Sequence, residues 1–162
     1  MVPKKVLFCS DFSENSEPAK KVAVEYAVAF GADLLLAHVV DWSGLPYYGE
    51  SLGEQLDQIL EHTERTSMAR LEELAKECAN MGAKTQIFCR TGLTAREIVS
   101  LANEQSADLI VLGTHGRTGV RHLVMGSVAR SVLKTAHRPV LIVEAPAEKG
   151  ETFEEPFEHS FP

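Results

Sequence analysis

Short apolar runs alternate with amphipathic segments along most of the chain. Five runs are typical of strands, because they are short, rich in apolar residues and bounded by turn-forming residues. These runs are KKVLFCS (4–10), DLLLAHVV (33–40), KTQIFCR (84–90), DLIVL (108–112) and RPVLIVE (138–144). The second and fourth runs are almost wholly apolar, which is typical of strands buried on both faces of a parallel sheet.

Four segments between or after these runs have apolar residues at helical spacing. In the first, Ser16 is expected to cap the start and Gly31 to end the helix. The second is long, from about Ser51 to Met81, and the third opens on TARE, in which Thr94 and Glu97 form a capping box. The predicted apolar stripes are Ala19, Val22, Ala23, Tyr26, Ala27 and Phe30; Leu52, Leu56, Ile59, Leu71, Leu74 and Cys78; Ile98, Leu101 and Ala102; and Val128, Val132, Leu133 and Ala136.

This alternation of strands and helices predicts the fold class. Right-handed crossovers between successive strands build a parallel sheet with helices on both faces. We therefore expect a doubly wound, Rossmann-like α/β fold with five parallel strands in the order 3-2-1-4-5. The length of 162 residues and the hydrophobic content of 44% fit a single domain, over residues 1–145.

Charge is distributed unevenly along the chain. The formal net charge is −7, and the acidic tail (146–162) contains five glutamates and one lysine. This composition is typical of disorder, although Phe153, Phe157 and Phe161 could form a small docking face. Between Gly113 and Arg138 the chain has eight basic or histidine residues and no acidic one, which predicts a local field that attracts anions. The acidic balance elsewhere argues against a nucleic-acid surface.

Two further features bear on the cellular setting. The three cysteines form no CxxC pair and lie in apolar patterns, which suits reduced, buried thiols better than disulfides or a zinc site. The apolar run at the start is short and meets Asp11 at once, and no stretch of about eighteen uncharged apolar residues occurs. We expect a cytoplasmic protein with no membrane segment.

The stretch GTHGRTGVRHLVMGSVARSV (113–132) is the strongest candidate for a site. Glycines let backbone amides approach a phosphate, and a helix that begins near Gly126 offers unpaired amides and a positive dipole end. In open α/β sheets, ligands bind at the carboxyl ends of strands where the winding reverses, here the first and fourth strands. The loops CSDFS (9–13) and LGTHGRTG (112–119) should therefore face each other across a phosphate-binding crevice, unless the glycines only make turns.

The spacing of these glycines matches neither a Walker A loop nor the GxGxxG fingerprint. Gly113, two residues, Gly116, nine residues and then Gly126-Ser127 resembles the signature of the ATP-binding branch of the universal stress protein family. DFSENSEPA (11–19), HVVD (38–41) and the order of elements from Val6 to Val143 are similar to that family as well.

The resemblance implies ATP or another adenine nucleotide lying across the ends of the first and fourth strands. It places adenine at Val39, the base and ribose near Ser10 and Asp11, and the sugar near Leu112 and Gly113. The phosphates would contact His115, Gly116, Gly126, Ser127 and Val128, with Mg²⁺ or Mn²⁺ sharing their charge. The resemblance also implies a homodimer joined through the last strand, Pro139 to Val143, whose apolar edge favours pairing with a second copy.

Hydrolysis would need a base, a cation and a cationic stabiliser near the γ-phosphate, and the candidates are Asp11, His115 and Arg117. Their spacing forms no recognisable catalytic set. We therefore expect a nucleotide-dependent regulatory or stress-response protein with at most slow ATP hydrolysis. A nucleotide-independent homodimeric interaction module and an enzyme on a phosphorylated small molecule remain alternatives. His38 is expected to be a hydrogen-bonded core side chain, and Trp42, Tyr47 and Tyr48 either cover the pocket or pack on the long helix.

Overall fold

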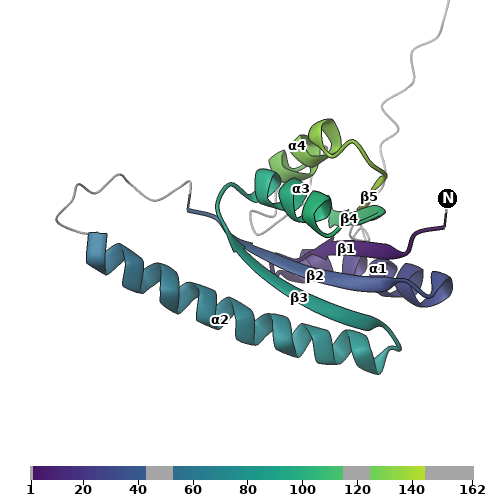
Figure 1. Ribbon diagram of the computed structural model, residues 1–162, viewed down its shortest axis with the longest axis horizontal. Coiled ribbons are helices and arrows are strands. Elements are labelled where there is room, and N and C mark those ends of the chain that lie inside the picture. The colour runs from purple at the N-terminus through teal and green to yellow at the C-terminus, as the bar shows by residue number, and fades with distance from the viewer. Residues whose placement is uncertain (1, 43–52, 115–124, 145–162) are drawn as a thin grey trace, which may run out of the picture.

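The computed structural model describes residues 2–42, 53–114 and 125–144. Its strands are β1 (Lys5–Cys9), β2 (Asp33–Val40), β3 (Lys84–Thr91), β4 (Leu109–Gly113) and β5 (Val140–Val143). They pair in parallel in one sheet with the order β3-β2-β1-β4-β5 (Figure 1). The predicted fold class and strand order are confirmed.

Helices cover both faces of this sheet. They are α1 (Glu17–Phe30), preceded by the 3-10 turn η1 (Glu14–Ser16), α2 (Gly53–Asn80), α3 (Thr94–Glu104) and α4 (Ser127–Thr135). Figure 1 shows α3 and α4 on the opposite side of the sheet from α2. The side of the sheet on which the chain returns therefore changes after β3, as the doubly wound class requires.

Two hydrophobic clusters form the core, one on each face. Because strand side chains alternate, Val6 and Phe8 of β1 point toward α1 and α2, whereas Leu7 points toward α3 and α4. The first cluster includes Ala23 of α1 and Leu71 of α2. The second includes, among others, Ile98 and Leu101 of α3 and Val132 of α4.

The predicted helical stripes are correct in the parts that face the sheet and wrong at their margins. Ala19, Ala23 and Ala27 bring α1 close to the sheet, so the larger Tyr26 and Phe30 lie at the side and are 38% and 46% exposed. Leu133 of α4 is also exposed. Ile59 is 58% exposed, because the N-terminal half of α2 extends beyond the ends of the strands (Figure 1). Leu52 lies outside the described residues.

Two of the three predicted helix caps lie at the predicted residue, but the predicted serine does not cap its helix through its side chain. Gly31 ends α1 with a left-handed φ of 63°, as expected. Ser16 occupies the N-cap of α1, but its hydroxyl donates to the Ser13 carbonyl (2.8 Å) instead of capping the helix. The capping box at Thr94 is wrong: Leu93 is the N-cap, and the Thr94 hydroxyl donates to Asp41 Oδ2 (2.7 Å) across from β2.

Arg138 is an exception to the predicted anion-attracting field. Its guanidinium donates to the carbonyls of Ala102 (2.7 Å) and Ala107 (2.6 Å) and to the Asn103 side chain. Ala102 and Asn103 lie in the last turn of α3, where carbonyls have no helical partner, and Ala107 lies between α3 and β4. The charge therefore stabilises the amino-terminal end of the sheet, far from the predicted crevice.

All three thiols are free, with Cys78 buried and Cys9 and Cys89 half-buried. No described helix combines the length and the apolar composition needed to cross a membrane.

Candidate functional site

A cleft of about 560 Å³ opens at the carboxyl ends of β1, β2 and β4. Its walls come from the ends of these strands, the first turn of α4 and parts of α2 and α3. Residues of the two loops predicted to face each other, Cys9–Asp11 and Leu112–Thr114, both line it. Its size lies within the range of small-molecule sites.

Most of the predicted site residues meet in this cleft. The residues that line it are Ser10, Asp11, Val39, Leu112, Gly113, Gly126, Ser127 and Val128. The other two, His115 and Gly116, lie outside the described residues, as do Tyr47, Tyr48 and Arg117. Trp42, the third residue of the predicted cover, is 51% exposed.

Buried polar side chains distinguish this cleft from the rest of the described surface. Among the residues that the structure describes, the buried polar side chains are those of Ser10, Ser16, His38 and Ser67, each 4–6% exposed. All four line this cleft. Ser10, Ser16 and His38 hydrogen-bond within the fold, so their collection at one cavity gives the cleft a fixed polar wall.

A network of hydrogen bonds fixes the loop after β1. Asp11 Oδ1 accepts from the amide (3.0 Å) and the hydroxyl (2.7 Å) of Ser13, and Ser10 Oγ accepts from the Phe12 amide (3.0 Å). His38 Nδ1 donates to the Ser10 carbonyl (2.7 Å), which requires the proton on Nδ1. The expectation of a hydrogen-bonded core histidine is confirmed, and Asp11 does cap the turn that follows it.

The start of α4 supplies donors to the opposite wall. Gly126 is the N-cap, and its amide donates to the Thr114 carbonyl (2.8 Å), which ties the helix start to the end of β4. The first amides of a helix have no intrahelical acceptor and lie at the positive end of the helix dipole. Ser127, Val128 and Ala129 therefore present donors suited to an anion.

Apolar side chains form another part of the lining. Val39 and Leu112 are 7% and 4% exposed, and Ile98 of α3 lies beside them in the lining. Burial raises the pKa of the Cys9 thiol to about 12, and the nearby Asp11 carboxylate adds to the effect. Cys9 is therefore a neutral, unreactive part of the wall at physiological pH.

The whole described domain matches one protein family. Residues 3–144 match the model of the universal stress protein family. This chain belongs to that family. It is 37% identical over 146 residues to universal stress protein MJ0531 of Methanocaldococcus jannaschii, a match that covers 88% of this chain and 83% of the relative.

Solved structures of universal stress proteins share the fold. MJ0577 from the same organism superposes with a TM-score of 0.82 at 28% identity, covering 91% of this chain and 100% of that one. A universal stress protein crystallised in complex with cAMP gives a TM-score of 0.65 at 25% identity, covering 89% and 98%.

Sequence reasoning missed several lining residues of this universal stress protein. Thr63 and Ser67 of α2 line the cleft, as do Asp41 and Thr94, which hydrogen-bond to each other. A signal for the first two was present: they continue the buried stripe of α2 toward its N-terminus at a spacing of four residues. Hydroxyl side chains on a core-facing stripe indicate that the helix there faces a cavity instead of the core.

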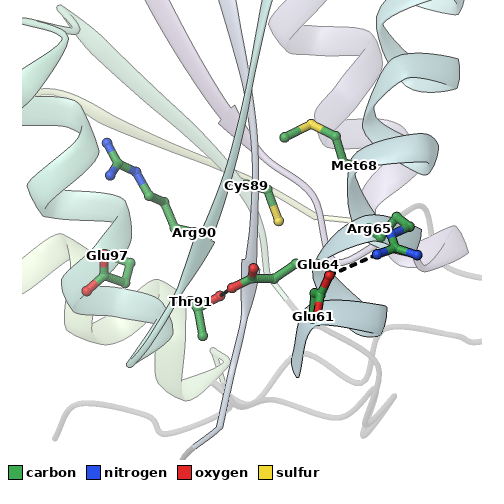
Figure 2. Close-up of a pocket in the computed structure, with 8 residues that line it drawn as sticks. All are labelled: Glu61, Glu64, Arg65, Met68, Cys89, Arg90, Thr91 and Glu97. Atoms are coloured by element: carbon green, nitrogen blue, oxygen red, sulfur yellow. Dashed lines mark hydrogen bonds and ion pairs between the residues drawn. The ribbon is translucent and has the colours of Figure 1, made fainter. Parts of the chain in front are cut away.

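A second cavity, of about 550 Å³, lies between α2 and the edge strand β3 (Figure 2). Several of its polar side chains have partners: Arg65 pairs with Glu61 (2.9 Å), the Thr91 hydroxyl donates to Glu64, and Arg90 pairs with Glu104, which lies outside the lining. Figure 2 shows Glu64 of α2 and Thr91 of β3 pointing toward each other. In this universal stress protein both arginines of the second cavity are therefore already paired with glutamates, and the cleft at the strand ends is the candidate site.

Proposed function

We propose that this chain is an ATP-binding regulatory protein that changes shape or partners with nucleotide occupancy and hydrolyses ATP slowly at most. The observation that carries this proposal is the convergence of four buried polar side chains and the N-terminus of α4 on one cleft. A helix N-terminus suits phosphates, and the apolar lining suits a purine. A related protein crystallised with cAMP, an adenine nucleotide, supports the class of ligand.

The lining suggests how the nucleotide would bind. Adenine would lie against Val39, the base and ribose near Ser10 and Asp11, the sugar also near Leu112, and the phosphates at the amides that begin with Ser127. Gly113, Gly126 and Val128 complete this set, and His115 and Gly116 are proposed to join it. A bound Mg²⁺ or Mn²⁺ would neutralise phosphate charge, and Asp11 and Asp41 are the carboxylates in the lining that could help to hold it.

The hydrogen bonds of Asp11 favour nucleotide binding over ATP hydrolysis as the function of the cleft. Of the three candidates for hydrolysis, Asp11 lies within the described residues, and its Oδ1 is engaged by both donors of Ser13. A carboxylate that holds a turn is poorly placed to take a proton from water at the same atom. We therefore propose a role as a switch in the cytoplasm, with turnover too slow to be its main activity.

Calorimetric titration with ATP and Mg²⁺ tests this proposal. The wild type should bind ATP, and Gly126→Val should abolish binding, since a Cβ and its methyls at the N-cap crowd the approach of a phosphate. Ser131→Val, on the exposed side of the same helix, is the control and should bind like the wild type. A wild type that binds no ATP in the presence of Mg²⁺ would contradict the proposal.

A homodimer through β5 is part of the proposal. β5 is the last strand of the sheet, and its four apolar residues, Val140–Val143, are all half-buried. An unpaired apolar edge favours pairing with the same strand of a second copy. Light scattering at micromolar concentration should report twice the mass of the chain, and a monomer would count against pairing. If the dimer forms but ATP does not bind, the chain is better described as a nucleotide-independent interaction module.

A further inference from the structure

The Phe12 ring lies between His38, which lines the cleft, and Arg70, an exposed residue of α2. One face of its ring stacks on His38, with centroids 4.3 Å apart and planes at 28°. The guanidinium of Arg70 lies over the ring, 4.3 Å from its centroid, and Arg70 Nη2 donates to the Phe12 carbonyl (3.2 Å). Arg70 is exposed, whereas His38 lines the cleft. The stack therefore connects an exposed cation of α2 with the wall of the candidate site.

The backbone of Phe12 is strained. Its φ is 61°, in the left-handed region that bulky residues seldom adopt. Such a conformation persists only where surrounding contacts hold it, and strained residues cluster at functional sites. Three contacts hold Phe12 here. Its amide donates to Ser10 Oγ, its carbonyl accepts from Arg70, and its ring makes a cation–π contact with the Arg70 guanidinium.

The direction of the chain at Phe12 decides where its neighbours lie. Ser10 and Asp11 precede it and line the cleft, and Ser13, which follows it, holds Asp11 Oδ1. If Phe12 relaxed to the right-handed or extended region, the chain after Asp11 would leave in another direction and this bond would break. Among the described residues that line the cleft Arg70 does not appear, and its contacts with the loop after β1 are made to Phe12.

We propose that Arg70 is a positioning residue: it holds Phe12 in the left-handed conformation and so orders Ser10 and Asp11 for the ribose side of the nucleotide. This inference rests on the proposed function. Because coupling between two equilibria is reciprocal, a bound nucleotide strengthens the contact between Arg70 and Phe12 by the same factor. Occupancy of the cleft is thereby linked to the contact between the loop after β1 and α2.

Two charge-matched variants separate this role from general electrostatics. Arg70→Met and Arg65→Met each remove one cation from an exposed side of α2, and the Arg65 guanidinium pairs with Glu61 (2.9 Å) of the same helix. Both lower the attraction for phosphates by a similar amount. The dissociation constant for ATP should be about three- to tenfold weaker in Arg70→Met than in Arg65→Met, as expected for a lost cation–π contact and hydrogen bond.

Two further measurements show whether Arg70 acts through Phe12. Arg70→Lys should recover part of the affinity, because an ammonium also binds a ring face and a carbonyl. In the Phe12→Leu background, Arg70→Met should have a smaller effect on the dissociation constant than in the wild type, because the cation–π contact is already absent and only the hydrogen bond to the residue-12 carbonyl remains to be lost. Urea unfolding of each variant shows that the affinities belong to folded protein.

A readout without nucleotide completes the test. The stacked Phe12 ring shields the His38 ring protons, so their NMR resonances should move downfield in Arg70→Met and stay in place in Arg65→Met. Equal affinities of the two methionine variants, or an unmoved His38 signal in Arg70→Met, would overturn this inference while leaving ATP binding intact. A wild type that binds no ATP would instead overturn the proposed function and this inference together.

Discussion

Replacement of Arg138 by alanine should weaken the fold without weakening nucleotide binding. The Arg138 guanidinium donates to the carbonyls of Ala102 and Ala107 at 2.7 and 2.6 Å, and it is half-buried. A hydrogen bond from a charged donor contributes about 1.5–3 kcal/mol, and partial exposure favours the lower value. The two bonds together give a loss of about 3 kcal/mol in the free energy of unfolding, or roughly 6–12 °C in Tm for a chain of this size.

Urea unfolding followed by circular dichroism measures this loss, with two controls. Arg138→Lys should restore about half of it, because a single ammonium does not match the guanidinium fork. Arg130→Ala removes a cation from the exposed side of α4 and one bond to the Met125 carbonyl (3.1 Å), so it should cost no more than about 1 kcal/mol.

Calorimetry with ATP supplies the second half of the test. Arg138 precedes β5 and contacts the end of α3, so it lies at the amino ends of the strands, whereas the cleft lies at their carboxyl ends. The affinity of Arg138→Ala for ATP should therefore equal that of the wild type. A variant of normal stability that bound ATP tenfold more weakly would show that this cation belongs to the anion-attracting field after all.

Three further predictions concern the framework around the cleft. Leu71→Ala should cost about 2–5 kcal/mol in urea unfolding, because Leu71 is fully buried, whereas Ile59→Ala, at an exposed position, should change it by less than about 0.5 kcal/mol. Gly92→Ala should destabilise by about 1–3 kcal/mol, since Gly92 has a φ of 153° and an added Cβ would lie 2.9 Å from a neighbouring side chain; an unchanged urea midpoint would contradict this strain. Burial raises the pKa of Cys9 to about 12 and that of Cys78 to about 11, so the folded chain keeps protons that unfolded thiols lose from about pH 9. Stability should therefore be fully present below pH 9 and fall as the pH rises toward 11–12, with a smaller fall in Cys9→Ala, and a flat profile would refute the assignment.

Local pattern was enough to locate the strands and the core stripes near them. DLLLAHVV coincides with β2, because an uninterrupted apolar run of this length is buried on both sides only in a central strand. The same reasoning failed at Ile59, where α2 extends beyond the sheet, and at Phe30, which lies at the side of α1. Periodicity reports which side of a helix is apolar, and the extent of the partner surface decides how much of that side is covered.

The residues of the cleft likewise fall into those that the sequence placed there and those that only the tertiary structure placed there. Sequence alone determined that residues after β1 and β4 and the start of α4 would share a crevice, because strand order and crossover direction follow from the alternation of elements. Only the tertiary structure decided that Ser67 joins them from α2, that Thr94 binds Asp41 instead of capping its helix, and that Arg138 holds the opposite end of the sheet. Each of these contacts joins residues more than thirty positions apart, and the partner of a polar side chain at that separation depends on packing that no local pattern encodes.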